Sequence, residues 1–136
     1  MATILIIEDN PANMKLALLL LRNAGHVTLF AVDAETGLTI ARTALPDLVW
    51  MDIQLPGMDG LAATALLKQD PATAAIPVIA LTAMAMKADR EKSLMAGCDA
   101  YIAKPLHYKE LYAAIALLLE RRPNATGRES LSVAAQ

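Results

Sequence analysis

The sequence predicts an α/β protein built on a five-stranded parallel sheet with five helices. Short apolar runs rich in Ile, Val and Leu alternate, up to about residue 120, with longer segments whose apolar residues recur at helical spacing. Because each helix carries the chain back across the sheet, the strands run parallel, and right-handed crossovers place helices on both faces. Strands that are apolar throughout are typical of a sheet covered on both sides, so a doubly wound arrangement is expected.

The expected strands are the short apolar runs. They are placed at residues 4–7, 27–32, 48–51, 78–81 and 100–103. Even the longest apolar stretches, such as Leu16 to Leu21, are far shorter than the roughly twenty residues that span a bilayer. The start of the chain also lacks the basic segment of a signal peptide. We therefore expect a cytoplasmic protein that does not bind a membrane.

The expected helices are delimited by capping and helix-breaking residues. The first begins near Pro11 or Ala12, because proline is tolerated where a helix's first amides have no internal partner, and it ends near Gly25. The second is capped by Asp33, runs to about residue 43 and is closed by Pro46. The remaining helices are expected at about 61–69, 86–96 and 108–120. Strands and helices are therefore predicted to alternate strictly along the chain.

Length and composition limit the domain organisation and the partners. The 136 residues suffice for one domain, expected at 1–120, and the segment 121–136 loses its periodicity and is expected to be a flexible tail. A formal net charge of -2 without a local basic patch argues against nucleic-acid binding. The single Cys98 can form no internal disulfide, in keeping with a reducing compartment. A monomer or weak homodimer is expected.

Polar residues follow most of the expected strands. Glu8 and Asp9 follow the first strand, Asp52 the third, Thr82 the fourth and Lys104 the fifth. In an open parallel sheet the carboxyl ends of the strands form one edge, where ligands bind. Each of these residues alone is more often a cap, a turn residue or a solvated side chain. Local roles of that kind seldom place complementary groups at four strand ends of one edge.

These groups suit the transfer of a phosphoryl group. Neighbouring carboxylates repel one another, and a bound cation relieves the repulsion. Mg2+ prefers oxygen ligands, so a magnesium site is expected at Glu8, Asp9 and Asp52. Asp52 would act as the nucleophile toward phosphorus, while Lys104 neutralises charge on the phosphoryl oxygens and Thr82 donates a hydrogen bond.

Several motifs of the sequence resemble the receiver domains of response regulators, the CheY-like superfamily. They are the run 4–10, the run 47–60, the pair Thr82-Ala83 and the pair Lys104-Pro105, and they match in order and in spacing. The resemblance extends from residue 3 to about 120 and implies a flavodoxin-like sheet with strand order 2-1-3-4-5. It also implies a signalling phosphoacceptor that promotes only its own phosphorylation and dephosphorylation and is otherwise no enzyme.

The resemblance further implies how the acidic residues divide the work. Asp52 looks like the phosphoacceptor, and Glu8, Asp9 and Asp52, with the backbone carbonyl of Gln54, look like the ligands of Mg2+. Gln54 argues against a hydrolase of the haloacid dehalogenase class, because that class needs a second Asp two residues after its Asp nucleophile. A phosphate-binding carrier of the flavodoxin kind is also disfavoured, since Glu8 and Asp9 would repel phosphate in the absence of a metal.

The same resemblance implies a switch. Thr82 looks like the hydroxyl that moves toward the phosphoryl group, and Tyr101 like the aromatic side chain that rotates inward with it. Lys104 looks like the lysine that binds the phosphoryl oxygens, and its bond to Pro105 is expected to be a cis peptide.

The expected partners are proteins. Single-domain regulators of the DivK type and the receivers of hybrid kinases look most similar, through the runs 8–13, 25–26, 83–89 and 97–98. The expected donor is a histidine kinase or histidine phosphotransfer protein, and the expected output is binding to a downstream effector. Two partner surfaces are expected, at the first helix and around the fourth: Leu16, Leu19 and Leu20, and Lys87, Arg90 and Tyr101.

Two alternative interpretations remain at this point. In one, the chain is a receiver excised from a larger hybrid kinase or regulator. In the other, it binds partners without being phosphorylated, although the complete set of strand-end groups argues against that reading.

Overall fold

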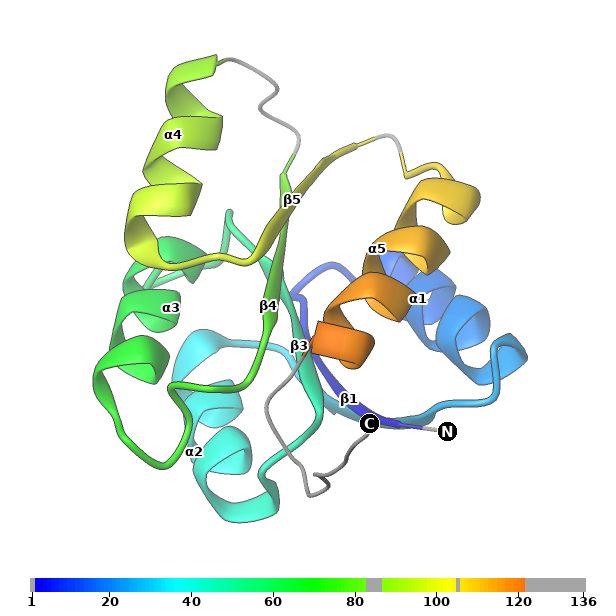
Figure 1. Ribbon diagram of the computed structural model, residues 1–136, viewed down its shortest axis with the longest axis horizontal. Helices are drawn as coiled ribbons and strands as arrows, with labels where there is room; N and C mark the ends of the chain where they lie inside the picture. The colour runs from blue at the N-terminus through cyan, green and yellow to red at the C-terminus, as the bar shows by residue number, and fades with distance from the viewer. Residues whose placement is uncertain (1, 83–86, 105, 122–136) are drawn as a thin grey trace.

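The protein is a five-stranded parallel sheet with helices on both faces (Figure 1). The computed structural model describes residues 2–82, 87–104 and 106–121. Strands and helices alternate as β1 (Thr3–Ile7), α1 (Pro11–Asn23), β2 (Val27–Ala31), α2 (Ala34–Ala44), β3 (Leu48–Asp52), α3 (Gly60–Gln69), β4 (Val78–Thr82), α4 (Lys87–Ala96), β5 (Ala100–Ala103) and α5 (Tyr108–Arg121). The strand order is β2-β1-β3-β4-β5, which confirms the predicted fold and order.

Local sequence explains where the first two helices begin and end. The Asn10 side chain caps α1 by accepting a hydrogen bond from the backbone N–H of Asn13, and Pro11 occupies the first turn. Gly25, with a φ of 87°, turns the chain after α1. Asp33 caps α2, its carboxylate accepting from the N–H of Thr36 at 2.7 Å. The expected boundaries of these helices are therefore confirmed to within two residues.

The core consists of two apolar layers, one on each face of the sheet. Figure 1 shows α1 and α5 on one side of the sheet and α2, α3 and α4 on the other. Side chains of each strand alternate between the layers, so that in β3 Trp50 packs beneath α1 and α5 while Val49 and Met51 face α2 and α3. All five residues of β3 and of β4 are buried, as expected for central strands covered on both faces.

A few element ends differ from the sequence prediction. Asp52 and Thr82 are the last residues of their strands and not the first residues of the following loops, because both remain in the hydrogen-bonded ladder. The second strand ends at Ala31, one residue early, and α5 extends to Arg121. Residues 122–136, expected to be a flexible tail, lie outside the described residues, as does Pro105 with its expected cis bond. Among the helices of the described ranges, none has both the length and the apolar character needed to cross a membrane.

Candidate functional site

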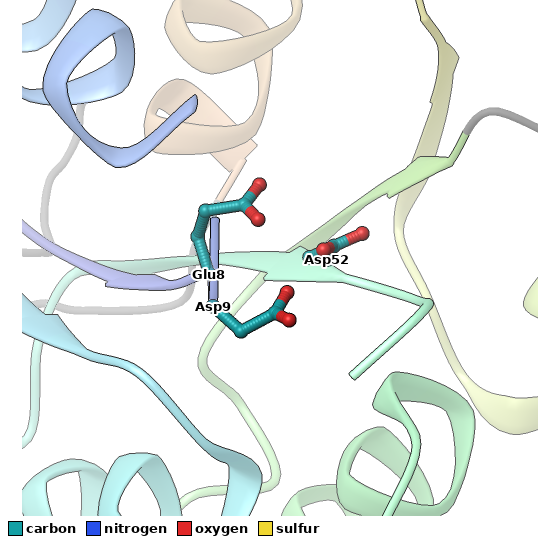
Figure 2. A group of neighbouring side chains, drawn as sticks. All are labelled: Glu8, Asp9 and Asp52. Atoms are coloured by element: carbon teal, nitrogen blue, oxygen red, sulfur yellow. The ribbon is translucent and has the colours of Figure 1, made fainter. Parts of the chain in front are cut away.

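Three carboxylates meet at the carboxyl ends of β1 and β3. Glu8 and Asp9 follow β1, and Asp52 ends β3. One carboxylate oxygen from each residue lies within 4.8 Å of the others, and Figure 2 shows the three side chains gathered beyond the strand ends. Glu8 and Asp52 are almost fully buried, with 1% and 3% of their surface exposed, whereas Asp9 is exposed. The sequence prediction that these residues lie together is borne out by this geometry.

Strand pairing explains why these carboxylates meet. β1 and β3 are direct neighbours, with Ile7 opposite Met51, so the residues that follow leave the sheet side by side. The backbone N–H of Glu8 still donates to the carbonyl of Ala31 at 3.0 Å, which holds Glu8 at the level of the sheet. The positions of Glu8 and Asp52 are therefore fixed by the most deeply buried part of the sheet.

Lys104 supplies the positive charge of the site. Its Nζ lies 3.4 Å from Glu8 Oε1 and 3.6 Å from Asp52 Oδ1. Its backbone N–H donates to the carbonyl of Thr82 at 2.7 Å and so continues the pairing of β4 and β5 up to the site. One ammonium therefore faces two buried carboxylates, which leaves an excess of negative charge for a further cation to neutralise.

Burial raises the pKa of Asp52 to about 6, and repulsion from Glu8 contributes to the rise. The ammonium of Lys104 and the backbone N–H of Gln54, which donates to Asp52 Oδ1 at 3.3 Å, oppose this shift and lower the pKa. Most of the Asp52 side chains are still ionised at neutral pH. The site thus holds a poorly solvated carboxylate that gains from a new positive partner.

Two cavities lie near the carboxyl ends of the strands. The first, of about 230 Å³, lies on the side of α3 and α4 and is lined by Thr82, Gln54, Lys92 and Ser93 among others. The second, of about 220 Å³, lies on the side of α1 and α5 and is lined by residues that include Glu8, Lys104 and Leu16.

The predicted switch residues Thr82 and Tyr101 come from the two strands β4 and β5. Thr82 ends β4, is buried and lines the cavity beside α4. Tyr101 in β5 is half-buried and packs against the apolar layer on the side of α2 and α3. Residues 83–86, which follow Thr82, lie outside the described part of the chain.

The predicted partner residues differ in exposure. Leu16 and Leu19 of α1 are exposed, Leu19 at 56%. Leu20 is only half-buried and packs against the core beneath α1 and α5, so it offers less surface than the sequence prediction assumed. Arg90 of α4 is exposed. The Lys87 side chain lies outside the described residues, although its backbone begins α4.

Sequence reasoning missed two features of the site. Gly60, the first residue of α3, lies so close to the backbone of Asp52 and Ile53 that a Cβ there would overlap them. Ser93 of α4 is buried and lines the cavity that also contains Thr82. The sequence offered only a small polar residue in a helix rich in charged residues as a signal for Ser93. No local pattern marks the approach of Gly60 to Asp52.

Comparison with known proteins places this site in a family. The family model described as the response regulator receiver domain matches residues 4–116. The chain is 46% identical over 104 residues to the polar-differentiation response regulator DivK of Brucella anthropi, and the match covers 76% of this chain and 85% of that protein. DivK of Brucella ovis matches to the same extent.

The solved structures that resemble this chain include receiver domains. The receiver domain of a sensor histidine kinase from Pseudomonas aeruginosa, solved with a magnesium ion in its active-site cleft, superposes with a TM-score of 0.82 at 34% identity, covering 88% of this chain and 98% of that one. The receiver domain of a signal transduction histidine kinase from Syntrophus aciditrophicus gives a TM-score of 0.85 at 30% identity, covering 98% and 100%. This chain belongs to the response regulator receiver domain family of two-component signalling systems.

Proposed function

We propose that this receiver is switched by transfer of a phosphoryl group to Asp52. The observation that carries the proposal is the pairing of a buried, poorly solvated carboxylate with one ammonium, Lys104, and two further carboxylates, Glu8 and Asp9. This set is suited to hold a phosphoryl group between Asp52 and Lys104 once the excess negative charge is neutralised.

A divalent cation fits the donor set. Three carboxylate oxygens within 4.8 Å of one another are hard ligands of the kind that Mg2+ prefers, and the Pseudomonas aeruginosa relative contains magnesium in its cleft. Glu8, Asp9 and Asp52, with the backbone carbonyl of Gln54, would hold the ion. When bound, it supplies positive charge that offsets repulsion between Asp52 and the phosphoryl oxygens.

The residues then divide the work of transfer. An oxygen of Asp52 attacks phosphorus, the bond from phosphorus to the donor breaks, and the donor leaves with the bonding electron pair. The Lys104 ammonium pairs with the phosphoryl oxygens, and the Thr82 hydroxyl moves toward them and donates a hydrogen bond. Tyr101 rotates inward with Thr82, which changes the surface formed by α4 and β5. A downstream effector binds to this changed surface.

The donor is a histidine kinase or a histidine phosphotransfer protein. A nitrogen–phosphorus bond of the donor histidine breaks as the Asp52 acyl phosphate forms. On this proposal the chain acts on no separate substrate. Its location in the cytoplasm stays a prediction from the sequence.

Acetyl phosphate tests this proposal directly. In the presence of Mg2+ we expect the wild-type mass to increase by one phosphoryl group, and we expect no increase with EDTA or in Asp52→Ala, because the nucleophile is gone. Glu35→Ala, which removes an exposed carboxylate from α2, is the matched control and should be modified like the wild type. Modification of Asp52→Ala at the wild-type rate would refute the assignment of Asp52.

The exposed leucines of α1 are proposed as the donor's docking surface. Leu16 lines the same cavity as Glu8 and Lys104, so the apolar face of α1 is continuous with the site. We expect Leu16→Gln and Leu19→Gln each to slow transfer from the phosphorylated donor roughly fivefold to tenfold, because each removes apolar contact area. Transfer from acetyl phosphate should not change, since it needs no docking.

Leu66→Gln on α3 is the control for docking, because it removes an exposed leucine from a different face. Rates of transfer from the donor that are unchanged in both α1 variants would show that the donor docks elsewhere.

A further inference from the structure

The outer edge of β2 is unusually open for the edge of a sheet. Among the described residues β2 pairs only with β1, so its other edge is left without a strand partner. From Val27 to Val32 the sequence contains no charged residue, proline or glycine. Proteins commonly protect such edges with charges, prolines or bulges, because unprotected edges pair with other chains. This edge has no protection of that kind.

Apolar side chains surround the same edge. Phe30 is 56% exposed and Val32 is 57% exposed. A groove of about 420 Å³ lies beside them between β2 and α2, with Leu29, Phe30 and Ile40 in its wall. Exposed apolar side chains next to an open strand edge are typical of a surface that contacts another protein.

Hydrogen bonds to β1 define which backbone groups of β2 point outward. The N–H of Val27 donates to the carbonyl of Ala2, and the carbonyl of Ala31 accepts from Glu8, so the odd-numbered residues direct their backbone groups toward β1. Because these directions alternate along a strand, Thr28 and Phe30 direct their N–H and C=O groups away from the sheet. Among the described residues, Phe30 therefore combines outward backbone groups that have no strand partner with an exposed aromatic side chain.

We propose that β2 pairs with β2 of a second copy of this chain, antiparallel, about a two-fold axis that is perpendicular to the sheet and passes midway between the two Phe30 residues. A two-fold axis in this direction keeps each side chain on its own face, so residue i lies opposite residue 60 - i of the copy. Phe30 then faces Phe30, and Thr28 faces Val32. This register uses the outward N–H and C=O groups of Thr28 and Phe30, and the two five-stranded sheets become one continuous sheet.

Charge complementarity favours a copy of this chain as the partner. Each outward N–H, with its partial positive charge, meets a carbonyl oxygen of the copy, so the edge is its own complement. Arg22 of α1 is held on Thr28 through a hydrogen bond from Nε to Oγ1 of 3.2 Å. Thr28 lies opposite Val32 of the copy, which precedes Asp33. Each end of the paired strands therefore carries a positive charge of one copy and a negative charge of the other, with Arg22 on the side of α1 and Asp33 at the start of α2. Within the register no like charges face each other.

The pairing leaves the phosphorylation machinery accessible. Glu8, Asp52 and Lys104 lie at the carboxyl ends of the strands, and antiparallel pairing directs the two sites to opposite ends of the joined sheet. β5 and α4 lie at the far edge from β2 and stay free to bind an effector.

Disulfide capture tests the register. The Cα atoms of a hydrogen-bonded antiparallel pair are about 5.5 Å apart, which lies within the range that a disulfide spans. In a Cys98→Ala background, which removes the native thiol, Phe30→Cys should form a covalent dimer under mild oxidation at least about tenfold faster than Leu117→Cys. Leu117 is similarly exposed but lies on α5. Equal rates for the two variants would overturn the proposal.

Sedimentation equilibrium of the unmodified full chain gives the second measurement. We expect reversible dimerisation, and we expect Phe30→Lys to raise the dissociation constant at least about tenfold, because it places two cations opposite each other and removes an aromatic pair. Leu94→Lys, a control on exposed α4, should dimerise like the wild type. A wild type that stays monomeric at the highest concentrations, or a Phe30→Lys variant that dimerises as well as the wild type, would overturn self-association through β2.

Discussion

Asp52→Asn is expected to raise the free energy of unfolding of the metal-free protein by about 1–3 kcal/mol at pH 7.5. Burial and repulsion from Glu8 raise the pKa of Asp52 from 3.8 to about 6, so the folded state resists ionisation of this carboxyl. At pH values between these two pKa values, the folded state binds more protons than the unfolded state. The free energy of unfolding therefore falls as the pH rises. Well above pH 6, where Asp52 is ionised in both states, the full cost is present, and asparagine removes it.

The pH dependence gives the sign of this effect. The difference between Asp52→Asn and the wild type should shrink as the pH falls from 7 toward 4, because Asp52 becomes protonated in both states. Urea unfolding in EDTA at several pH values measures it. Glu35→Gln, which neutralises an exposed carboxylate, should change stability by less than about 0.5 kcal/mol at every pH. An Asp52→Asn protein that is less stable than the wild type at pH 7.5 would show that the carboxylate is not electrostatically strained.

Magnesium should reverse the order of stability. A ligand that binds only the folded state stabilises it according to its concentration and dissociation constant. Mg2+ is therefore expected to stabilise the wild type much more than Asp52→Asn, which has lost one of the proposed ligands.

Gly60→Val is expected to destabilise the protein by about 2–4 kcal/mol and to weaken phosphorylation. A Cβ at Gly60 would lie 2.8 Å from the Cα of Ile53 and would also overlap the carbonyl oxygen of Asp52, and both are backbone atoms that cannot rotate away. Relief requires α3 to move away from the end of β3. The hydrogen bond from the N–H of Gly60 to the carbonyl of Ile53, now 2.9 Å, would be strained by the same movement.

The loss of activity should exceed the loss of folded protein, because the clash acts on the residue that carries the carboxylate. Urea unfolding measures stability, and acetyl phosphate labelling of the folded protein measures the site. Gly25→Ala is a suitable control, since its Cβ would meet no atom within 4 Å and only the positive φ is costly, at about 1 kcal/mol. A Gly60→Val protein with wild-type stability and labelling would show that α3 moves freely relative to β3.

The residues at the strand ends were predictable because periodicity identifies strands well. Once the apolar runs are read as parallel strands, Glu8, Asp9, Asp52 and Lys104 must emerge at one edge, and the structure places them there. The burial of Glu8 and the raised pKa of Asp52 were not predictable, because they depend on how closely neighbouring elements cover the strand ends.

Contacts between distant segments escaped sequence reasoning. The overlap of Gly60 with the backbone of Asp52 depends on the direction in which α3 leaves the loop, which no local pattern encodes. The exposure of Leu20 depends on the rotation of α1 about its axis, and in a helix apolar on several faces the sequence does not define that rotation. Leu45, an exposed residue with a φ of 47° after α2, shows a turn for which glycine would have been expected.

The walls of the site differ in mechanical stiffness because they belong to different parts of the sheet. Glu8 and Asp9 follow β1 and Asp52 ends β3, and each of these two strands has a strand on both sides. Lys104 follows β5, a four-residue strand whose only strand neighbour among the described residues is β4. When a ligand pulls on both groups, Lys104 and β5 are therefore displaced more readily than the three carboxylates. The direction of any movement is thus built into the strand order, toward the edge that carries Tyr101.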